Sequence, residues 1–385
     1  MFSVLKHLYG AFDIRSEVNE IFIHRIIDAF AFGLVGVFVP IYLFNIGYSL
    51  NDVFLYLALT FLFYSIFAGP ALKLAEKIGI KHTVTLSQVM LVALFLLLRQ
   101  VQSPVIPVFF LAAFTGLIKM LYWMPLNTDF AVATHPGHTG KETAMLHMFP
   151  QIAAIAAPLI GGVLITYLGF EMLFLVGAVL ILASVWPLFI TKERFEAIRM
   201  KKTDVFSKRN FPLFNIFLAN GFFFAAYLLW PFYVYITVPD YVFTGIITAL
   251  VGLSTALVIY FVGRFEDRIG VRPILRIGGA ANFVLWISVL FVDSRLGLGV
   301  LSFFFGIVSG FILVPTLDFA VKIAKNRKSA AEVMLLRELP LGFGRFALLF
   351  LPVFLPDGIK FQAVFVLAAV ASLYFFLTDD IEKIW

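Results

Sequence analysis

Long apolar runs, broken by Pro, Gly and charged residues, dominate the chain from residue 21 onward. A helix needs about 20 apolar residues to cross a bilayer core about 30 Å thick, and most of these runs approach that length. Helices are the expected form, because hydrocarbon offers no hydrogen-bond partner to an open strand edge. The pattern therefore predicts twelve membrane-spanning helices. Their approximate ranges are 21–45, 52–70, 83–101, 104–128, 143–168, 171–191, 212–237, 241–263, 273–292, 296–320, 331–354 and 359–378.

Composition agrees with this pattern. The chain has 385 residues, of which 62% are hydrophobic and 14% charged. Soluble proteins carry roughly 45–50% apolar and about 25% charged residues. The excess apolar surface cannot be hidden in a core of ordinary size and must face lipid. An all-α integral membrane protein is expected.

The distribution of Lys and Arg predicts the orientation. With the N-terminus in the cytoplasm, the external loops hold only Arg99, Arg295 and Lys360 of the 29 basic residues. Such a bias follows the positive-inside rule and predicts that both termini are cytoplasmic. The net charge of +6 is then a topology signal, and nucleic acid is not an expected partner. No cleavable signal peptide is recognisable at the N-terminus.

Catalytic motifs are not recognisable in the sequence. It contains no phosphate-binding glycine loop, no HExxH and no nucleophile elbow. We therefore expect neither an enzyme nor an ATP-driven pump, and no cofactor. Without cysteines there is no disulfide or cysteine metal site, and no metal is expected.

An internal duplication divides the chain. LKLAEKIGIK at 72–81 is echoed by GRFEDRIGVR at 263–272, and TDFAV at 128–132 by LDFAV at 317–321. The offsets of about 190 residues predict two parallel six-helix halves with a substrate site between them. The expected domains are an N-terminal bundle at 1–191, a cytoplasmic linker at 192–211 and a C-terminal bundle at 212–385.

The second repeat resembles the signature loop of the major facilitator superfamily, G-x-x-x-D-R-x-G-R-R/K. The matching positions are Gly263, Asp267, Arg268, Gly270 and Arg272, and their degraded counterparts in the first half are Glu76, Lys77, Gly79 and Lys81. The resemblance implies two pseudo-symmetric six-helix bundles around a central cavity, with these loops acting as a conformational latch. Glycine permits a tight turn, and the acidic residue can face the positive N-terminus of a neighbouring helix. The alternative is that both loops only set topology.

A second signature lies on the fifth span. AAIAAPLIGG resembles the antiporter motif of the same family, with Ala153, Ala157, Pro158, Gly161 and Gly162 at its small-residue and proline positions. The resemblance implies antiport, and hence export. Alternatively, the small residues only allow close helix packing, without any consequence for direction.

Charged residues inside spans are functional candidates, because each costs at least about 2.5–3.5 kcal/mol near the bilayer centre. Lys119 is the deepest, and it shares a helical face with Thr115 and Tyr122. It could bind an anionic substrate group, or it could belong to a structural ion pair. Asn220 and Tyr227, which share a face of the seventh span, are weaker candidates for substrate contact.

The acidic residues of the spans are candidates for proton coupling. Asp28, with Arg25 three residues earlier, is either a proton carrier or half of a permanent ion pair. Glu338 is the second candidate. Arg345 shares its helical face and is expected at the substrate site, whereas Arg337 should point elsewhere.

His147, on the fifth span, titrates near neutral pH when unperturbed. It is either a further coupling residue or a solvated residue at the cytoplasmic mouth.

The sequence favours a monomeric secondary transporter in a prokaryotic inner membrane. It would export a small amphipathic or anionic organic solute by alternating access, coupled to protons. One alternative is an uptake permease or uniporter for a nutrient or anion. Others are a membrane enzyme or lipid scramblase, or a sensor that transports nothing.

Overall fold

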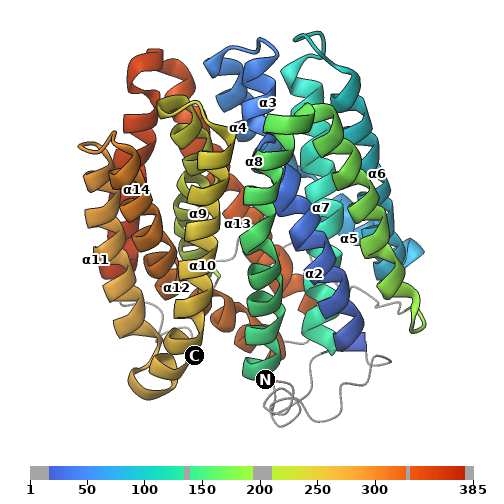
Figure 1. The fold of residues 1–385 in the computed structure, drawn as a ribbon. Coiled ribbons are helices and arrows are strands. Elements are labelled where there is room, and N and C mark those ends of the chain that lie inside the picture. The colour runs from blue at the N-terminus through green and yellow to red at the C-terminus, as the bar shows by residue number, and fades with distance from the viewer. Residues whose placement is uncertain (1–16, 134–138, 194–209, 327–329, 378–385) are drawn as a thin grey trace, which may run out of the picture.

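The computed structural model describes residues 17–133, 139–193, 210–326 and 330–377, and these ranges contain helices and turns but no strand (Figure 1). The α-helices are α2 (Glu17–Val35), α3 (Val39–Asn45), α4 (Leu50–Ile66), α5 (Ala68–Ile78), α6 (Ile80–Gln100), α7 (Val108–Ala133), α8 (Thr139–Val185), α9 (Phe211–Thr237), α10 (Tyr241–Ile269), α11 (Val271–Val289), α12 (Arg295–Asn326), α13 (Ala330–Phe350) and α14 (Lys360–Leu377). Short 3-10 turns follow α8 (Trp186–Phe189) and α13 (Leu351–Phe354), and a third precedes α14 (Asp357–Ile359).

Within these ranges, eight helices are long and apolar enough to cross a membrane, or nine if the bent pair α4 and α5 counts as one span. That pair bends by 52°. Helix α8 turns back on itself at Gly169, whose φ of +77° breaks the helix, so its two arms are separate passes (Figure 1). Helices α11 and α13 have similar lengths but carry arginines within the span. Counting each of these passes gives the predicted twelve.

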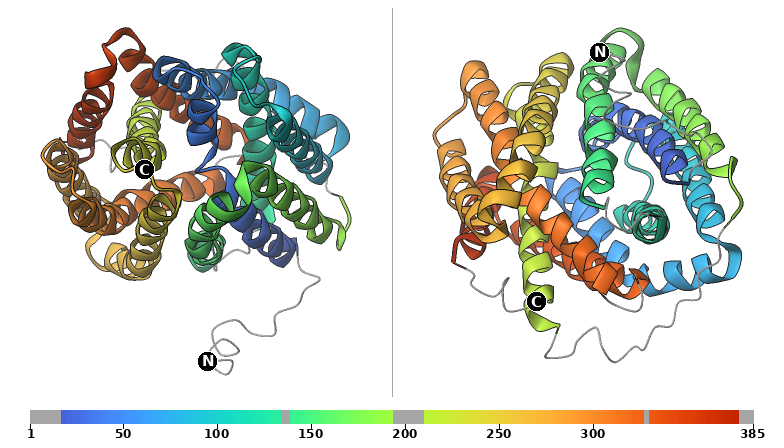
Figure 2. Two further views of the ribbon diagram at one scale, coloured as in Figure 1. Left: turned by 45° about the horizontal axis from the view of Figure 1, so that its top comes forward. Right: turned by 90° about the horizontal axis from the view of Figure 1, so that it is seen from below.

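The helices form two groups that follow chain order. Figure 2 shows α2 to α8 on one side of the molecule and α9 to α14 on the other. Most of the contact between the groups is made by α8 against α10 and by α4 against α13. The predicted linker, 192–211, lies almost entirely outside the described residues.

The repeated loops share one backbone geometry. Gly79 has φ +98° and ψ 157° directly before α6, and Gly270 has φ +84° and ψ 167° directly before α11. Only glycine enters this region without strain. Pro125 inside α7 and Pro315 inside α12 are a further matched pair, 190 residues apart. Equivalent points of the two halves thus have equivalent local structure.

Small residues of the fifth span bring backbones into contact. A Cβ atom on Gly162 would lie 2.3 Å from the carbonyl oxygen of Tyr241, on α10 in the other half. A Cβ atom on Gly161 would lie 2.4 Å from the carbonyl oxygen of Leu34 within the same half. Ala157 is fully buried. This segment of α8 therefore packs closely both inside its own half and across the interface.

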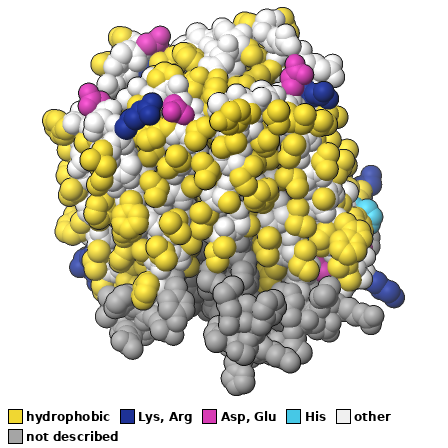
Figure 3. Space-filling view, in the orientation of Figure 1, with side chains coloured by type: hydrophobic (Ala, Val, Ile, Leu, Met, Phe, Trp, Pro, Cys, Tyr) yellow, Lys and Arg dark blue, Asp and Glu magenta, His cyan; other side chains and the backbone are white. Residues whose placement is uncertain are grey.

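The outer surface is apolar over most of its height. Figure 3 shows hydrophobic side chains covering the middle of the visible face, with charged side chains near its upper and lower edges. Large apolar residues are strongly exposed, such as Phe291 at 81%, Trp186 at 73% and Phe110 at 66%. A surface of this kind is stable only against lipid, and the protein is an integral membrane protein.

Candidate functional site

Two cations from different halves share one aromatic ring. Lys119 of α7 places its Nζ 5.7 Å from the ring centre of Phe61, and Arg345 of α13 places its Cζ 5.0 Å from the same centre. Lys119 also lies over Phe32 at 4.9 Å, and Arg345 over Phe224 at 5.7 Å. Helices α2, α4, α7, α9 and α13 thus converge on one aromatic-walled site that both halves build.

Neither cation of this site has an ion-pair partner among the described residues, although the charge of Glu338 attracts Arg345 from a longer distance. Neither Lys119 nor Arg345 forms an ion pair with a carboxylate of the described chain, and the buried Nε of Arg345 has no hydrogen-bond partner there. The two cations lie close enough to repel each other. Ring contacts stabilise a cation by about 0.5–2 kcal/mol, which does not replace a counter-ion. An anion placed between the cations would relieve the repulsion.

Glu338 connects the halves directly beside this site. Its side chain is 2% exposed and accepts hydrogen bonds from Tyr64 of α4 and from Asn127 of α7, the latter at 3.0 Å. The expectation that Arg337 points elsewhere is wrong, since its guanidinium contacts Glu338 in an ion pair. A long arginine side chain can bend around its helix to reach a buried neighbour, which helical spacing alone does not show.

Asp28 is the centre of a second buried network. Its carboxylate accepts hydrogen bonds from Arg25 at 2.8 Å, from Gln88 at 2.7 Å and from Tyr122 at 2.6 Å. Arg25 also donates to Tyr122 at 2.9 Å and stacks 4.6 Å from the Trp123 ring centre. The ion pair between Arg25 and Asp28 is therefore formed in this structure, and α2, α6 and α7 all contribute to it.

Four of the residues expected to contact the substrate form hydrogen bonds with other groups of the protein. Thr115 lies 3.2 Å from the Tyr56 hydroxyl, and Tyr122 binds Asp28 and Arg25. Asn220 donates to Thr316, and Tyr227 donates to Asn282 and to the carbonyl of Phe305, so both bond within the C-terminal half. A shared helical face identified these residues as a set, but it could not tell which neighbour the face meets.

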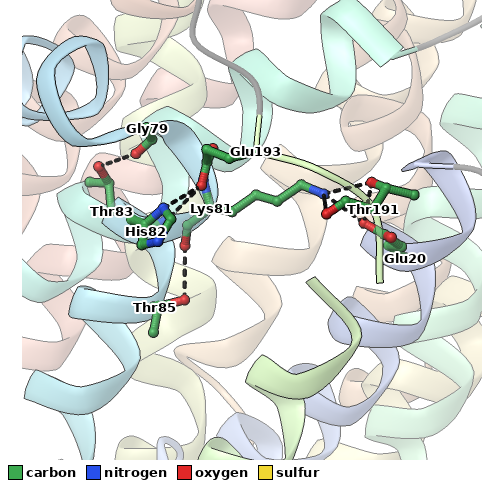
Figure 4. Close-up of polar contacts among 8 residues, drawn as sticks. All are labelled: Glu20, Gly79, Lys81, His82, Thr83, Thr85, Thr191 and Glu193. Atoms are coloured by element: carbon green, nitrogen blue, oxygen red, sulfur yellow. Dashed lines mark hydrogen bonds and ion pairs between the residues drawn. The ribbon is translucent and has the colours of Figure 1, made fainter. Parts of the chain in front are cut away.

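The first signature loop ties together elements of its own half (Figure 4). Lys81 is buried, and its Nζ lies 2.8 Å from Glu20 of α2 and 2.8 Å from Thr191, just after α8. Glu193 accepts hydrogen bonds from the backbone N–H groups of Lys81 and His82 at 3.0 and 3.1 Å. Its carboxylate thus occupies the positive N-terminus of α6, where an anion is favoured.

Glu76 was expected to face the N-terminus of a neighbouring helix; at α6 the carboxylate in that place is Glu193. Glu76 and Lys77 are exposed, and Glu193 takes the place at α6. Gly79 is required there, because its φ of +98° would strain any other residue, and a Cβ atom would also lie 2.6 Å from the Glu193 carboxyl carbon. Sequence reasoning missed Glu20 and Glu193. Glu193 belongs to no motif position, and its only signal was its place directly after the sixth span.

Several expected residues cannot be placed. The side chains of His147, Gly263, Asp267 and Arg268 lie outside the described part of the chain. Of the second signature loop, Gly270 and Arg272 are described, at the start of α11.

The capping carboxylate gives a direct test of the loop. Glu193→Gln should lower the free energy of unfolding by about 1 kcal/mol, because it removes a charged cap from α6. The matched variant Glu76→Gln should change it by less than about 0.5 kcal/mol, as expected of an exposed residue. Thermal and denaturant unfolding of the purified protein would measure both. A larger loss in Glu76→Gln than in Glu193→Gln would contradict the assignment.

Comparison with known proteins agrees with this architecture. The family model described as Major Facilitator Superfamily matches residues 21–330. The multi-drug resistance efflux pump PmrA homolog of Lactococcus lactis subsp. lactis is 26% identical over 313 residues, which cover 75% of each chain. The multidrug resistance protein MdtG of Klebsiella pneumoniae is 26% identical over 305 residues, covering 74% of this chain and 73% of that protein.

A solved structure shows the same fold. The crystal structure of the nucleoside transporter NupG superposes with a TM-score of 0.65, covering 96% of this chain and 98% of that one. Its sequence identity is 15%, so this likeness concerns the fold alone. The match of the family model over most of the chain decides the family. This chain belongs to the Major Facilitator Superfamily of membrane transporters.

Proposed function

We propose that this transporter exports small amphipathic organic anions by alternating access, in exchange for protons. The observation that carries the proposal is the pair of cations, Lys119 and Arg345, that meet on the Phe61 ring between the two halves. Inside a membrane protein, charges of this kind mark the path of a substrate or a coupling ion. Two cations with aromatic neighbours match an anion that also carries an apolar body.

The aromatic walls fit the apolar part of such a substrate. Phe32, Phe61 and Phe224 are contributed by α2, α4 and α9, so an aromatic or aliphatic body could be enclosed from both halves. Concave apolar surfaces with a few well-placed polar groups are the usual form of small-molecule sites. Carboxylates, sulfonates and phosphates attached to an apolar body are the chemical classes that fit.

The position of the cations suits alternating access. Because Lys119 belongs to the N-terminal half and Arg345 to the C-terminal half, rocking of the halves changes the distance between them. A bound anion that contacts both cations would favour conformations in which the halves are close. Release would follow when the two contacts separate.

Glu338 is the favoured proton-coupling residue. It holds Tyr64 and Asn127 of one half and Arg337 of the other, so its negative charge helps to keep α13 against α4 and α7. Protonation would remove that charge and weaken all three contacts. A proton could in this way change the relative stability of the two conformations. Asp28, with its bonds to Arg25 and Tyr122, is the second candidate.

Export is the direction that the relatives favour. The compared proteins are named as a multidrug efflux pump and a multidrug resistance protein. The small-residue motif of the fifth span, at Pro158, Gly161 and Gly162, supports antiport in the same way. The bacterial relatives and the basic loops support an inner-membrane location with both termini cytoplasmic, and the protein is proposed to act as a monomer.

The alternative is an uptake permease or uniporter for organic anions. The cation pair favours it as much as export, because charge complementarity carries no direction. Transport into inverted and right-side-out vesicles, with and without a pH gradient, separates the two functions.

The cation pair predicts a charge preference in binding. Lys119→Gln and Arg345→Gln should each weaken binding of an aromatic carboxylate about 10- to 150-fold, the loss expected for a charge-assisted hydrogen bond. A matched aromatic ammonium should bind neither variant more weakly than the unaltered protein. Isothermal titration of purified protein measures both probes. The control is Arg295→Gln, an exposed external arginine that should leave binding unchanged.

Unchanged carboxylate affinity in both variants would remove the proposed substrate site. Weakening by Arg295→Gln to the same extent would show that the effect comes from overall charge and not from the central site.

Proton coupling predicts a separation of two transport modes. Glu338→Gln should abolish transport driven by a pH gradient and keep exchange of labelled for unlabelled substrate within about threefold. The neutral amide keeps the size of the side chain but cannot bind and release the proton. Proteoliposome flux measures both modes, and Glu171→Gln, an exposed carboxylate, is the control. Gradient-driven transport that survives Glu338→Gln would remove Glu338 as the coupling residue.

A further inference from the structure

One face of α2 carries three buried titratable side chains in a row. Glu20, His24 and Asp28 follow at intervals of four residues and are 0%, 0% and 5% exposed. Residues four apart lie on the same helical face, about 6 Å apart along the axis. The row starts at the cytoplasmic end expected for α2 and ends at the Asp28 network. It lies inside the N-terminal half, in contact with α6, α7 and α8.

His24 is held in a defined protonation pattern. Its Nδ1 lies 2.7 Å from the carbonyl oxygen of Ser184, which can only accept a hydrogen bond, so Nδ1 carries a proton. In the neutral ring, Nε2 is then an acceptor. This Nε2 atom is buried and has no hydrogen-bond partner among the described residues.

Glu20 leaves a second buried acceptor one turn away. Its Oε2 binds Lys81 at 2.8 Å and Thr191 at 3.0 Å, but its Oε1 is buried and has no partner in the described chain. His24 and Glu20 lie one turn apart on the same face of α2, so their side chains are neighbours on the helix surface. Buried acceptors are rarely left unsatisfied. A water molecule can donate to both atoms, and a single proton can be shared between them.

Both ends of the row connect to other groups. At the outer end, Glu20 meets Lys81 and the partly exposed Thr191, near the cytoplasmic surface. At the inner end, the His24 ring centre lies 5.7 Å from that of Tyr122, whose hydroxyl donates to Asp28 at 2.6 Å.

We propose that Glu20 and His24 form a proton relay, bridged by water, between the cytoplasmic face and Asp28. The relay rests on proton coupling through Asp28, the second candidate of the proposed function, and adds to it a route that lies away from the Lys119 and Arg345 pair. Protons could then leave or reach Asp28 while the substrate site is occupied.

The relay step is balanced in protons. The bridging water takes a proton from the Asp28 side and passes one to Nε2 of His24, which forms the imidazolium. Nε2 then returns the proton to that water, which passes one to the Glu20 carboxylate. Nδ1 keeps its proton for Ser184 throughout, so the ring needs no tautomer change. The charged and titratable groups that face the relay are Lys81 from α6, Tyr122 from α7 and Arg25 and Asp28 from α2 itself.

The test uses two histidine replacements with different geometry. Asparagine in His24→Asn can keep the hydrogen bond to Ser184, because its amide nitrogen takes the place of Nδ1, but it has nothing in place of Nε2. Glutamine in His24→Gln reaches the place of Nε2 but cannot carry a proton onward. His82→Asn is the matched control, because His82 is an exposed histidine outside the row.

Proton release on substrate binding is the measured quantity, followed by stopped-flow with a pH indicator, alongside substrate counterflow in proteoliposomes without a pH gradient. His24→Asn, His24→Gln and Glu20→Gln should each slow proton release at least tenfold. Counterflow should stay within twofold of the unaltered protein, since it needs no net proton movement. His82→Asn should change neither rate.

Three outcomes would overturn the relay. Proton release at the unaltered rate in all three variants between about pH 5 and 9 would exclude the route. Equal loss of counterflow and proton release would show that His24 and Glu20 only hold α2 in place. If the unaltered protein releases no proton on substrate binding, the proposed proton coupling fails, and the relay fails with it. This outcome is measured before any variant is made.

Discussion

The cost of placing charge in hydrocarbon governs the whole arrangement. A lone charge near the bilayer centre is so unfavourable that each one must find a partner or serve a function. In the described chain, Asp28 and Glu338 are surrounded by donors, and Lys81 is paired with Glu20. Lys119 and Arg345 depart from this rule, since both lie over aromatic rings and neither forms an ion pair in the described chain. That departure, located where the two halves meet, is what points to a substrate.

The interface between the halves combines two kinds of contact. Along α8 and α10, glycine brings backbones together, as at Gly162 against Tyr241. Between α4 and α13 the contact is polar, through Tyr64 and Glu338. A pair of close-packed helices can act as a pivot, whereas a polar contact can respond to a proton or an anion. In alternating access, the close-packed pair would be the axis about which the halves rotate. The polar pair would respond to the binding of a proton or an anion.

The fold could be predicted from the sequence because apolar runs, the bias of basic residues and the repeated segments are all visible along the chain. Sequence reasoning also identified Lys119, Arg345, Asp28 and Glu338 as candidates, since charge inside a span is visible without coordinates. It failed where a partner lies far along the chain. It did not predict Glu193 at the α6 N-terminus, nor Thr316 as the acceptor of the Asn220 hydrogen bond. Sequence spacing describes one helix and not the neighbour that the helix meets.

The central claim is that Lys119 and Arg345 hold one anion between the halves. The most direct measurement is an experimental structure of the protein with a bound aromatic carboxylate. The carboxylate should lie within hydrogen-bond distance of both cations, with the aromatic body against Phe61. A carboxylate bound away from both cations, or cations that face a protein carboxylate in the bound state, would contradict it.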